Sequence, residues 1–253
     1  MKSFLSSVVI VLATLPATAG ITYDFRTVTT GMQASEQAGQ ITVDGGNMRL
    51  EFKSGDGMMF RNGSVALSHN GGSTIDVLDP QAKTFWQLDL SSLNAAALAG
   101  MVKMSNEKVN VRDAGDGGTI EGYATQHKVV TASADMNIGA QAMHLELTME
   151  TWTTDKVPTE AASFLQRRLG STGFPMLDKL IAAQSEAVKG FPLRQITHMK
   201  VGQGTSGSLI EMSSTTNVTN VKKTNVAPSL FVVPADYKKT ASPVEKMMGG
   251  SAQ

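Results

Sequence analysis

Alternation of apolar and polar residues is the feature that most constrains how this chain can fold. The clearest run covers residues 143–150, in which every second residue is apolar: Met143, Leu145, Leu147 and Met149. Successive side chains of a strand point to opposite faces, so this run predicts a strand with one apolar face and one polar face. Shorter alternating runs at 21–25 and 48–52 indicate further strands.

Turn-forming residues separate other predicted strands. Asp79-Pro80 lies between the alternating runs 74–78 and 84–88, and this pattern favours a hairpin with a tight turn. The glycine-rich segments 113–118 and 202–207 indicate two more turns. Together these signals predict a mostly antiparallel sheet of roughly ten strands.

Helical periodicity is confined to three segments, 91–104, 159–169 and 175–189. The third segment has both ends marked, with Pro175 in its first turn and Gly190 as its stop. These segments interrupt the strands rather than alternating with each of them. The predicted class is therefore α+β, with about three helices packed on one antiparallel sheet.

The first 19 residues look like a secretory signal peptide. Lys2 supplies a positive charge, residues 4–15 are largely apolar, and Ala17-Thr18-Ala19 is a small-residue cleavage site. Twelve residues span about 18 Å as a helix, which is too short for a hydrocarbon core of ~30 Å. No later stretch is apolar enough to span a membrane, so we do not expect a membrane-spanning protein.

The absence of cysteine bears on the compartment. No disulfide can form, and no cysteine follows the cleavage site to be acylated, so export fits a bacterial periplasm without lipidation. The expected organisation is a signal peptide at 1–19, a single β-rich domain at 20–239 and a flexible tail at 240–253.

Composition excludes several functional classes. The 22 basic and 22 acidic residues balance to a net charge of +0, which argues against a nucleic-acid partner. Without cysteine the chain has no thiolate zinc site, iron–sulfur cluster or thiol nucleophile. The four histidines show no metal-ligand spacing within one element, so no metal and no cofactor are expected.

Two short motifs resemble enzyme signatures but lack the required context. Gly202 to Gly207 matches the dinucleotide fingerprint, yet a strand-like run follows it where that fingerprint needs a helix. Ser105 to Lys108 has the serine–lysine spacing of penicillin-recognising enzymes without their companion motifs. We expect a protein that is not an enzyme, and a hydrolase with a dispersed site stays open as an alternative.

Methionine is the oddest feature of the composition, with 15 residues of this type. Flexible thioethers fill irregular gaps in a core, and they also line malleable apolar pockets. Capture of copper(I) by thioethers is a third alternative, but no methionine-rich tract supports it. The candidate residues for a hydrophobic ligand are Met101, Met104, Met143, Leu145, Leu147, Met149 and Trp86.

The order of short motifs resembles a known type of family. Gly46 to Phe52, the hairpin 74–88, Gly122-Tyr123, the run 150–154 and the closing segment 230–237 occur in that order. This resembles an uncharacterised family of secreted bacterial domains, a domain of unknown function, related to the outer-membrane lipoprotein carriers of LolA/LolB-like fold. The resemblance implies a curved, incompletely closed antiparallel β-barrel, a half-barrel whose concave face is covered by helices. Carriers of that fold hold lipoprotein acyl chains there.

Two hypotheses on function follow. The first is a soluble periplasmic binding protein of the cell envelope that holds a lipid or acyl-type ligand in the concave face, with a lipid, an acyl chain or a lipoprotein as partner. The alternative is a structural or protein-interaction domain of the envelope with a filled core, whose protein partners the sequence does not identify. A cavity above ~300 Å³ favours the first hypothesis over the second.

Overall fold

The computed structural model describes residues 19–31, 34–55, 61–69, 74–89, 102–138, 141–158, 179, 182–183, 185, 189–202 and 208–243. Within these residues the chain is built almost entirely of strands. They are β1 (Ala19–Gly31), β2 (Ser35–Asp44), β3 (Asn47–Ser54), β4 (Val65–Ser68), β5 (Thr74–Asp79), β6 (Thr84–Asp89), β7 (Val102–Ile120), β8 (Tyr123–Ile138), β9 (Gln141–Thr154), β10 (Phe191–Gly202), β11 (Ser208–Asn225) and β12 (Lys238–Lys239).

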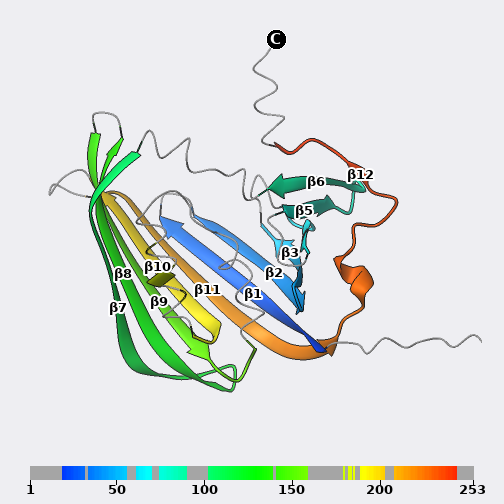
Figure 1. The fold of residues 1–253 in the computed structure, drawn as a ribbon, viewed down its shortest axis with the longest axis horizontal. Coiled ribbons are helices and arrows are strands. Elements are labelled where there is room, and N and C mark those ends of the chain that lie inside the picture. Colours follow the sequence, from blue (N-terminus) through cyan, green and yellow to red (C-terminus); the bar gives the residue numbers. More distant parts are fainter. Residues whose placement is uncertain are drawn as a thin grey trace, which may run out of the picture.

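All twelve strands belong to one sheet, in the order β12-β6-β5-β4-β3-β2-β1-β11-β10-β9-β8-β7. Neighbouring strands are antiparallel, except that β12 runs parallel to β6. β1 and β11 pair with each other and join two meanders, β1 to β6 and β7 to β11. Figure 1 shows β7 to β11 as long curved strands side by side, with the short strands β5 and β6 near the opposite edge of the sheet.

The α+β prediction is wrong for the described residues. The sheet has twelve strands, is open between its edge strands β7 and β12, and forms an all-β fold. The short 3-10 helix Pro228–Phe231 is the one helix whose bounds lie within these residues. Strand pairing overrides helical periodicity at 102–104, because these residues start β7 and pair with β8.

The remaining helix predictions fall largely outside the described residues. Segments 91–101 and 159–169 lie outside them completely. Within 175–189 the structure describes Lys179, Ala182, Ala183, Ser185 and Lys189, and the first four of these are helical.

Hairpin turns explain much of the local structure. The predicted hairpin is confirmed, since β5 and β6 pair from Thr74↔Asp89 to Asp79↔Thr84. In the turn between them, the Asp79 carboxylate accepts hydrogen bonds from the backbone N–H groups of Gln81 and Ala82. The turn predicted at 113–118 is wrong, because β7 continues through that segment with register shifts. The chain reverses instead at Glu121-Gly122, whose positive φ angles of 51° and 81° suit a two-residue hairpin.

The two faces of the sheet have different chemistry. We call the face that carries Met143, Leu145, Leu147 and Met149 face A, and the opposite one face B. On face B of β4 and β5, the C-terminal residues Val233 and Tyr237 pack against a small core. Three further hydrophobic clusters lie on face A, so this face carries most of the core.

Candidate functional site

The candidate site is an apolar area of face A on β7 to β11, which we call the Met/Leu field. The strand register brings its members together: Leu147 lies opposite Ala132 and Met199, and Met149 lies opposite Val130. The field consists of Met104, Val109, Val111, Val130, Ala132, Ala134, Met136, Met143, Leu145, Leu147, Met149, Met199, Val201 and Met212. Val130, Ala132, Ala134 and Val201 are buried, whereas most of the methionines and leucines of the field remain partly exposed.

Five of the seven residues predicted to contact a ligand lie in this field: Met104, Met143, Leu145, Leu147 and Met149. Trp86 shares face A but packs in a separate cluster with Ala66, Ile75 and Val77. This cluster lies on β4 to β6, towards the other end of the strand order. Met101 lies outside the described residues.

Three methionines of the field were not singled out by the sequence: Met136, Met199 and Met212. Met136 lies between Met104 and Met143 in the register, and Met199 lies between Leu147 and Met212. The alternation Val130, Ala132, Ala134, Met136 was a usable signal for the first of them. The neighbours of Met199 depend on strand order, which local patterns do not encode.

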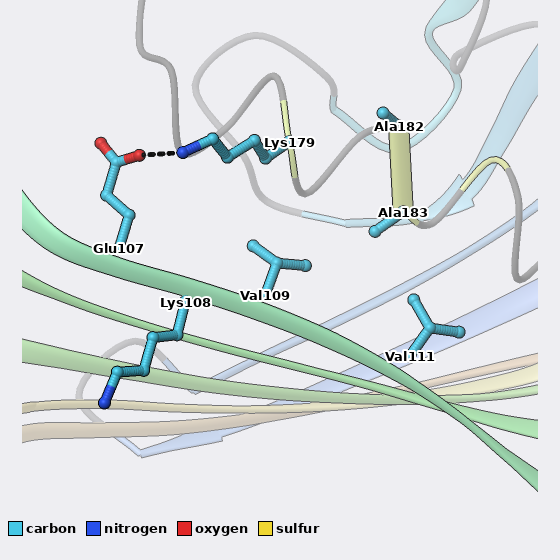
Figure 2. Close-up of a pocket in the computed structure, with 7 residues that line it drawn as sticks. All are labelled: Glu107, Lys108, Val109, Val111, Lys179, Ala182 and Ala183. Atoms are coloured by element: carbon cyan, nitrogen blue, oxygen red, sulfur yellow. Dashed lines mark hydrogen bonds and ion pairs between the residues drawn. The ribbon is translucent and has the colours of Figure 1, made fainter.

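A hollow of about 590 Å³ borders the field at β7. Figure 2 shows Val109 and Val111 pointing into it from β7, with Ala182 and Ala183 on the opposite side. Lys179 Nζ donates to Glu107 Oε2 at 3.0 Å and links these two sides. Lys108 also lines the hollow, and its ammonium group points away from it in the same view.

A row of polar residues ends the field on one side. The row crosses seven neighbouring strands in register and consists of Asp113, Lys128, Thr151, Gln195, Thr216, Thr27 and Gln37. We call it the polar row. The hydroxyl oxygens of Thr27 and Thr216 lie 2.9 Å apart, which is hydrogen-bond distance. The next row towards the field still carries Thr29 and Ser214, whose hydroxyls are 3.4 Å apart.

The charges of the polar row neutralise one another. Lys128 donates a hydrogen bond to Asp113, and the backbone N–H of Gly115 donates a second one at 2.9 Å. These hydrogen bonds hold the pKa of the Asp113 carboxyl below its usual value. The other five residues of the row carry no charge.

Beyond the polar row, face A carries a second apolar region, which we call the closed core. Its buried residues are Ile21, Tyr23, Val43, Met48, Val157, Phe191, Leu193 and Val218. Tyr23 and Phe191 meet edge to face, with ring centroids 5.1 Å apart. Burial raises the pKa of the Tyr23 hydroxyl, as expected for a phenol away from water.

Face B of the same strands carries a stacked cluster. The rings of His127 and Trp152 are nearly parallel at a centroid distance of 4.2 Å, and the guanidinium of Arg194 lies 5.8 Å from the Trp152 ring. His127 Nε2 is 2.9 Å from Glu150 Oε2 without the geometry of a hydrogen bond. Both faces of the indole are occupied by protein groups, so this cluster stabilises the sheet surface.

No group of three or more metal-ligating side chains gathers in the part of the chain that the structure describes. Nor does any described helix have the length and apolarity needed to cross a membrane. The geometry thus defines a β-sheet protein with a methionine-rich apolar field bounded by polar residues.

The chain belongs to the family described as Domain of unknown function (DUF4412), which matches residues 26–237. This confirms the expected membership of an uncharacterised family. No curated protein matches the chain significantly.

Three solved structures are similar over most of this chain. An uncharacterized conserved protein from Thermus thermophilus shares 11% identity over 89% of this chain and 91% of its own, with a TM-score of 0.39. PNGF-II shares 12% identity over 91% of this chain but 33% of its own, with a TM-score of 0.37. A LolA superfamily protein from Nitrosomonas europaea shares 8% identity over 86% of this chain and 91% of its own, with a TM-score of 0.31. At TM-scores this low, we carry over no property of these proteins.

Proposed function

We propose that this protein binds a lipid or acyl-type hydrophobic ligand on the Met/Leu field of face A. The observation that carries the proposal is the gathering of partly exposed methionine and leucine side chains on adjacent strands of one face. Burying such side chains under a ligand gains about 25 cal/mol per Å² of apolar area before the costs of association. Flexible thioethers let the surface adapt to chains of different shape.

The hollow beside the field supports this proposal over a filled interaction domain. Its volume of about 590 Å³ falls within the roughly 300–1,000 Å³ of small-molecule sites. Val109 connects it to the field, because this residue packs against the cluster around Val130 and Ala132. A ligand on the field can therefore extend into the hollow.

The test compares two neighbouring residues of β9. Leu147→Asp places a charge in the field, whereas Thr148→Asp places the same charge on face B. We expect Leu147→Asp to weaken binding of the apolar dye N-phenyl-1-naphthylamine at least tenfold, and Thr148→Asp to leave it unchanged. Circular dichroism checks the fold, and Leu147→Ser replaces Leu147→Asp if the latter does not fold. Equal dye binding by all folded variants would overturn the proposal.

We also propose that the protein acts in the periplasm after removal of residues 1–19. Native mass spectrometry of protein from a periplasmic extract tests this together with the ligand. The expected protein begins at Gly20 and carries a co-purifying lipid or acylated peptide. A mass that retains residues 1–19 would contradict the location, and a ligand-free mass with no uptake of added lipid would contradict the binding.

A further inference from the structure

We infer that the ligand is a single-chain amphiphile with an uncharged head group that bears hydroxyl groups, and that the polar row binds this head group. The inference rests on the proposed function and adds the chemical class of the ligand. The polar row lies on the same face as the two apolar regions and separates them. On β10, Leu193 belongs to the closed core, Gln195 to the polar row and Met199 to the Met/Leu field.

A ligand that covers the polar row must offer hydrogen-bond partners to it, because otherwise the row weakens binding. Hydroxyl and amide groups that a ligand covers lose hydrogen bonds to water, and each group left without a partner weakens binding. Thr27 and Thr216 bond each other, and each hydroxyl still has capacity left, because a hydroxyl offers one donor and two acceptor sites. The amide of Gln195, between Thr151 and Thr216 in the register, offers two donors and an acceptor.

The charges of the row favour an uncharged head group. Lys128 is its one cation, and Asp113 already pairs with it. An anionic head group would have to compete with Asp113 for Lys128, and the remaining members supply only neutral hydrogen-bonding groups. Glycerol-like or sugar-like hydroxyls match these groups without leaving a charge unpaired.

The dimensions of the field suit one acyl chain. From Thr151 in the polar row to Met143 at the far end of β9 there are eight residue steps, or about 26 Å at ~3.3 Å per residue. One leaflet of a bilayer contributes about 15 Å of the ~30 Å hydrocarbon core. A membrane-derived chain whose head lies at the row therefore fits on the field along β9.

The experiment separates head-group recognition from binding of the apolar part. N-phenyl-1-naphthylamine, which has no polar head, reports on the field, and it is displaced by monolauroylglycerol or by laurate. The variants Gln195→Met and Thr216→Val remove hydrogen-bonding groups from the row. Thr215→Val is the matched control, because Thr215 is the next residue of β11 and lies on face B.

For the unmodified protein we expect monolauroylglycerol to bind at least tenfold more tightly than laurate. Gln195→Met and Thr216→Val should each weaken monolauroylglycerol about tenfold and leave dye affinity unchanged, while Thr215→Val changes neither. If the folded row variants bind monolauroylglycerol as well as the unmodified protein, or if laurate binds more tightly, the inference is overturned and the proposed function stands. If the unmodified protein does not bind the dye, the proposed function fails and this inference with it. Gln195→Met alone supplies the test if Thr216→Val does not fold.

Discussion

The Met/Leu field and the closed core lie on the same face of one sheet. Residues on or just beyond β8, β9, β10 and β11 belong to both. In the closed core, Phe191 and Leu193 are 1% and 0% exposed, and aromatic rings meet at fixed angles. In the field, flexible methionines and leucines around Ala132 and Ala134 remain partly exposed. Apolar alternation alone therefore does not distinguish a buried core from a partly exposed apolar surface.

Removing a ring from the closed core should have the largest effect. Phe191→Ala deletes a fully buried side chain and its contact with Tyr23 and leaves a cavity. We expect it to lower the free energy of unfolding by about 3–5 kcal/mol, measured by urea denaturation. Val232→Ala is the control, because Val232 is 59% exposed and should change stability by less than about 0.5 kcal/mol. Similar losses for both variants would contradict a closed core.

The same substitution on each side of the polar row tests whether the two regions differ in burial. Leu193→Ala should cost about 2–5 kcal/mol of stability because Leu193 is completely buried. Leu147→Ala should cost only about 1 kcal/mol, since its side chain is partly exposed. Dye binding should show the reverse order, with the larger loss for Leu147→Ala. Equal stability losses would mean that the field is as well packed as the core.

Adding a carbon tests the free space in the two regions. A Cβ on Gly39 would lie 2.3 Å from the backbone oxygen of Glu51 and 2.7 Å from Cε1 of Phe25. Gly39→Ala should therefore destabilise the protein by about 1–3 kcal/mol through overpacking. Val111→Ile adds one methylene at the hollow and should be neutral within about 0.5 kcal/mol. Thermal unfolding of both variants decides the matter, and a neutral Gly39→Ala would refute tight packing beside the core.

The smallest expected effect is on the pH dependence of stability, through Asp113 in the polar row between the two regions. Because the folded state lowers the pKa of Asp113, its carboxylate stabilises the fold above the unfolded pKa of about 3.9. That contribution is lost as the pH falls through the lower folded value. Asp113→Asn should therefore reduce stability slightly at pH 7 and change it little at pH 2, as measured by urea denaturation at both values. An equal change at both pH values would show that the charge of Asp113 has no part in it.

Local patterns predicted several elements correctly. The run 143–150 lies within β9, and the two runs around Asp79-Pro80 form the hairpin β5–β6. Patterns failed where two structures share one signal. Gly115 and Gly118 have positive φ angles and accompany register shifts within β7 rather than a chain reversal, because positive φ angles serve both purposes. At 102–104 the helical spacing was outweighed by pairing with β8.

The sequence by itself determined that β9 has an apolar face and that Met143, Leu145, Leu147 and Met149 share it, since side chains alternate along any strand. It also determined the absence of thiol chemistry. Only the tertiary structure decided that Met199 and Met212 join these residues, that Trp86 does not, and that a polar row ends the field. These facts depend on strand order and register, and residues far apart in the chain become neighbours only when their strands pair.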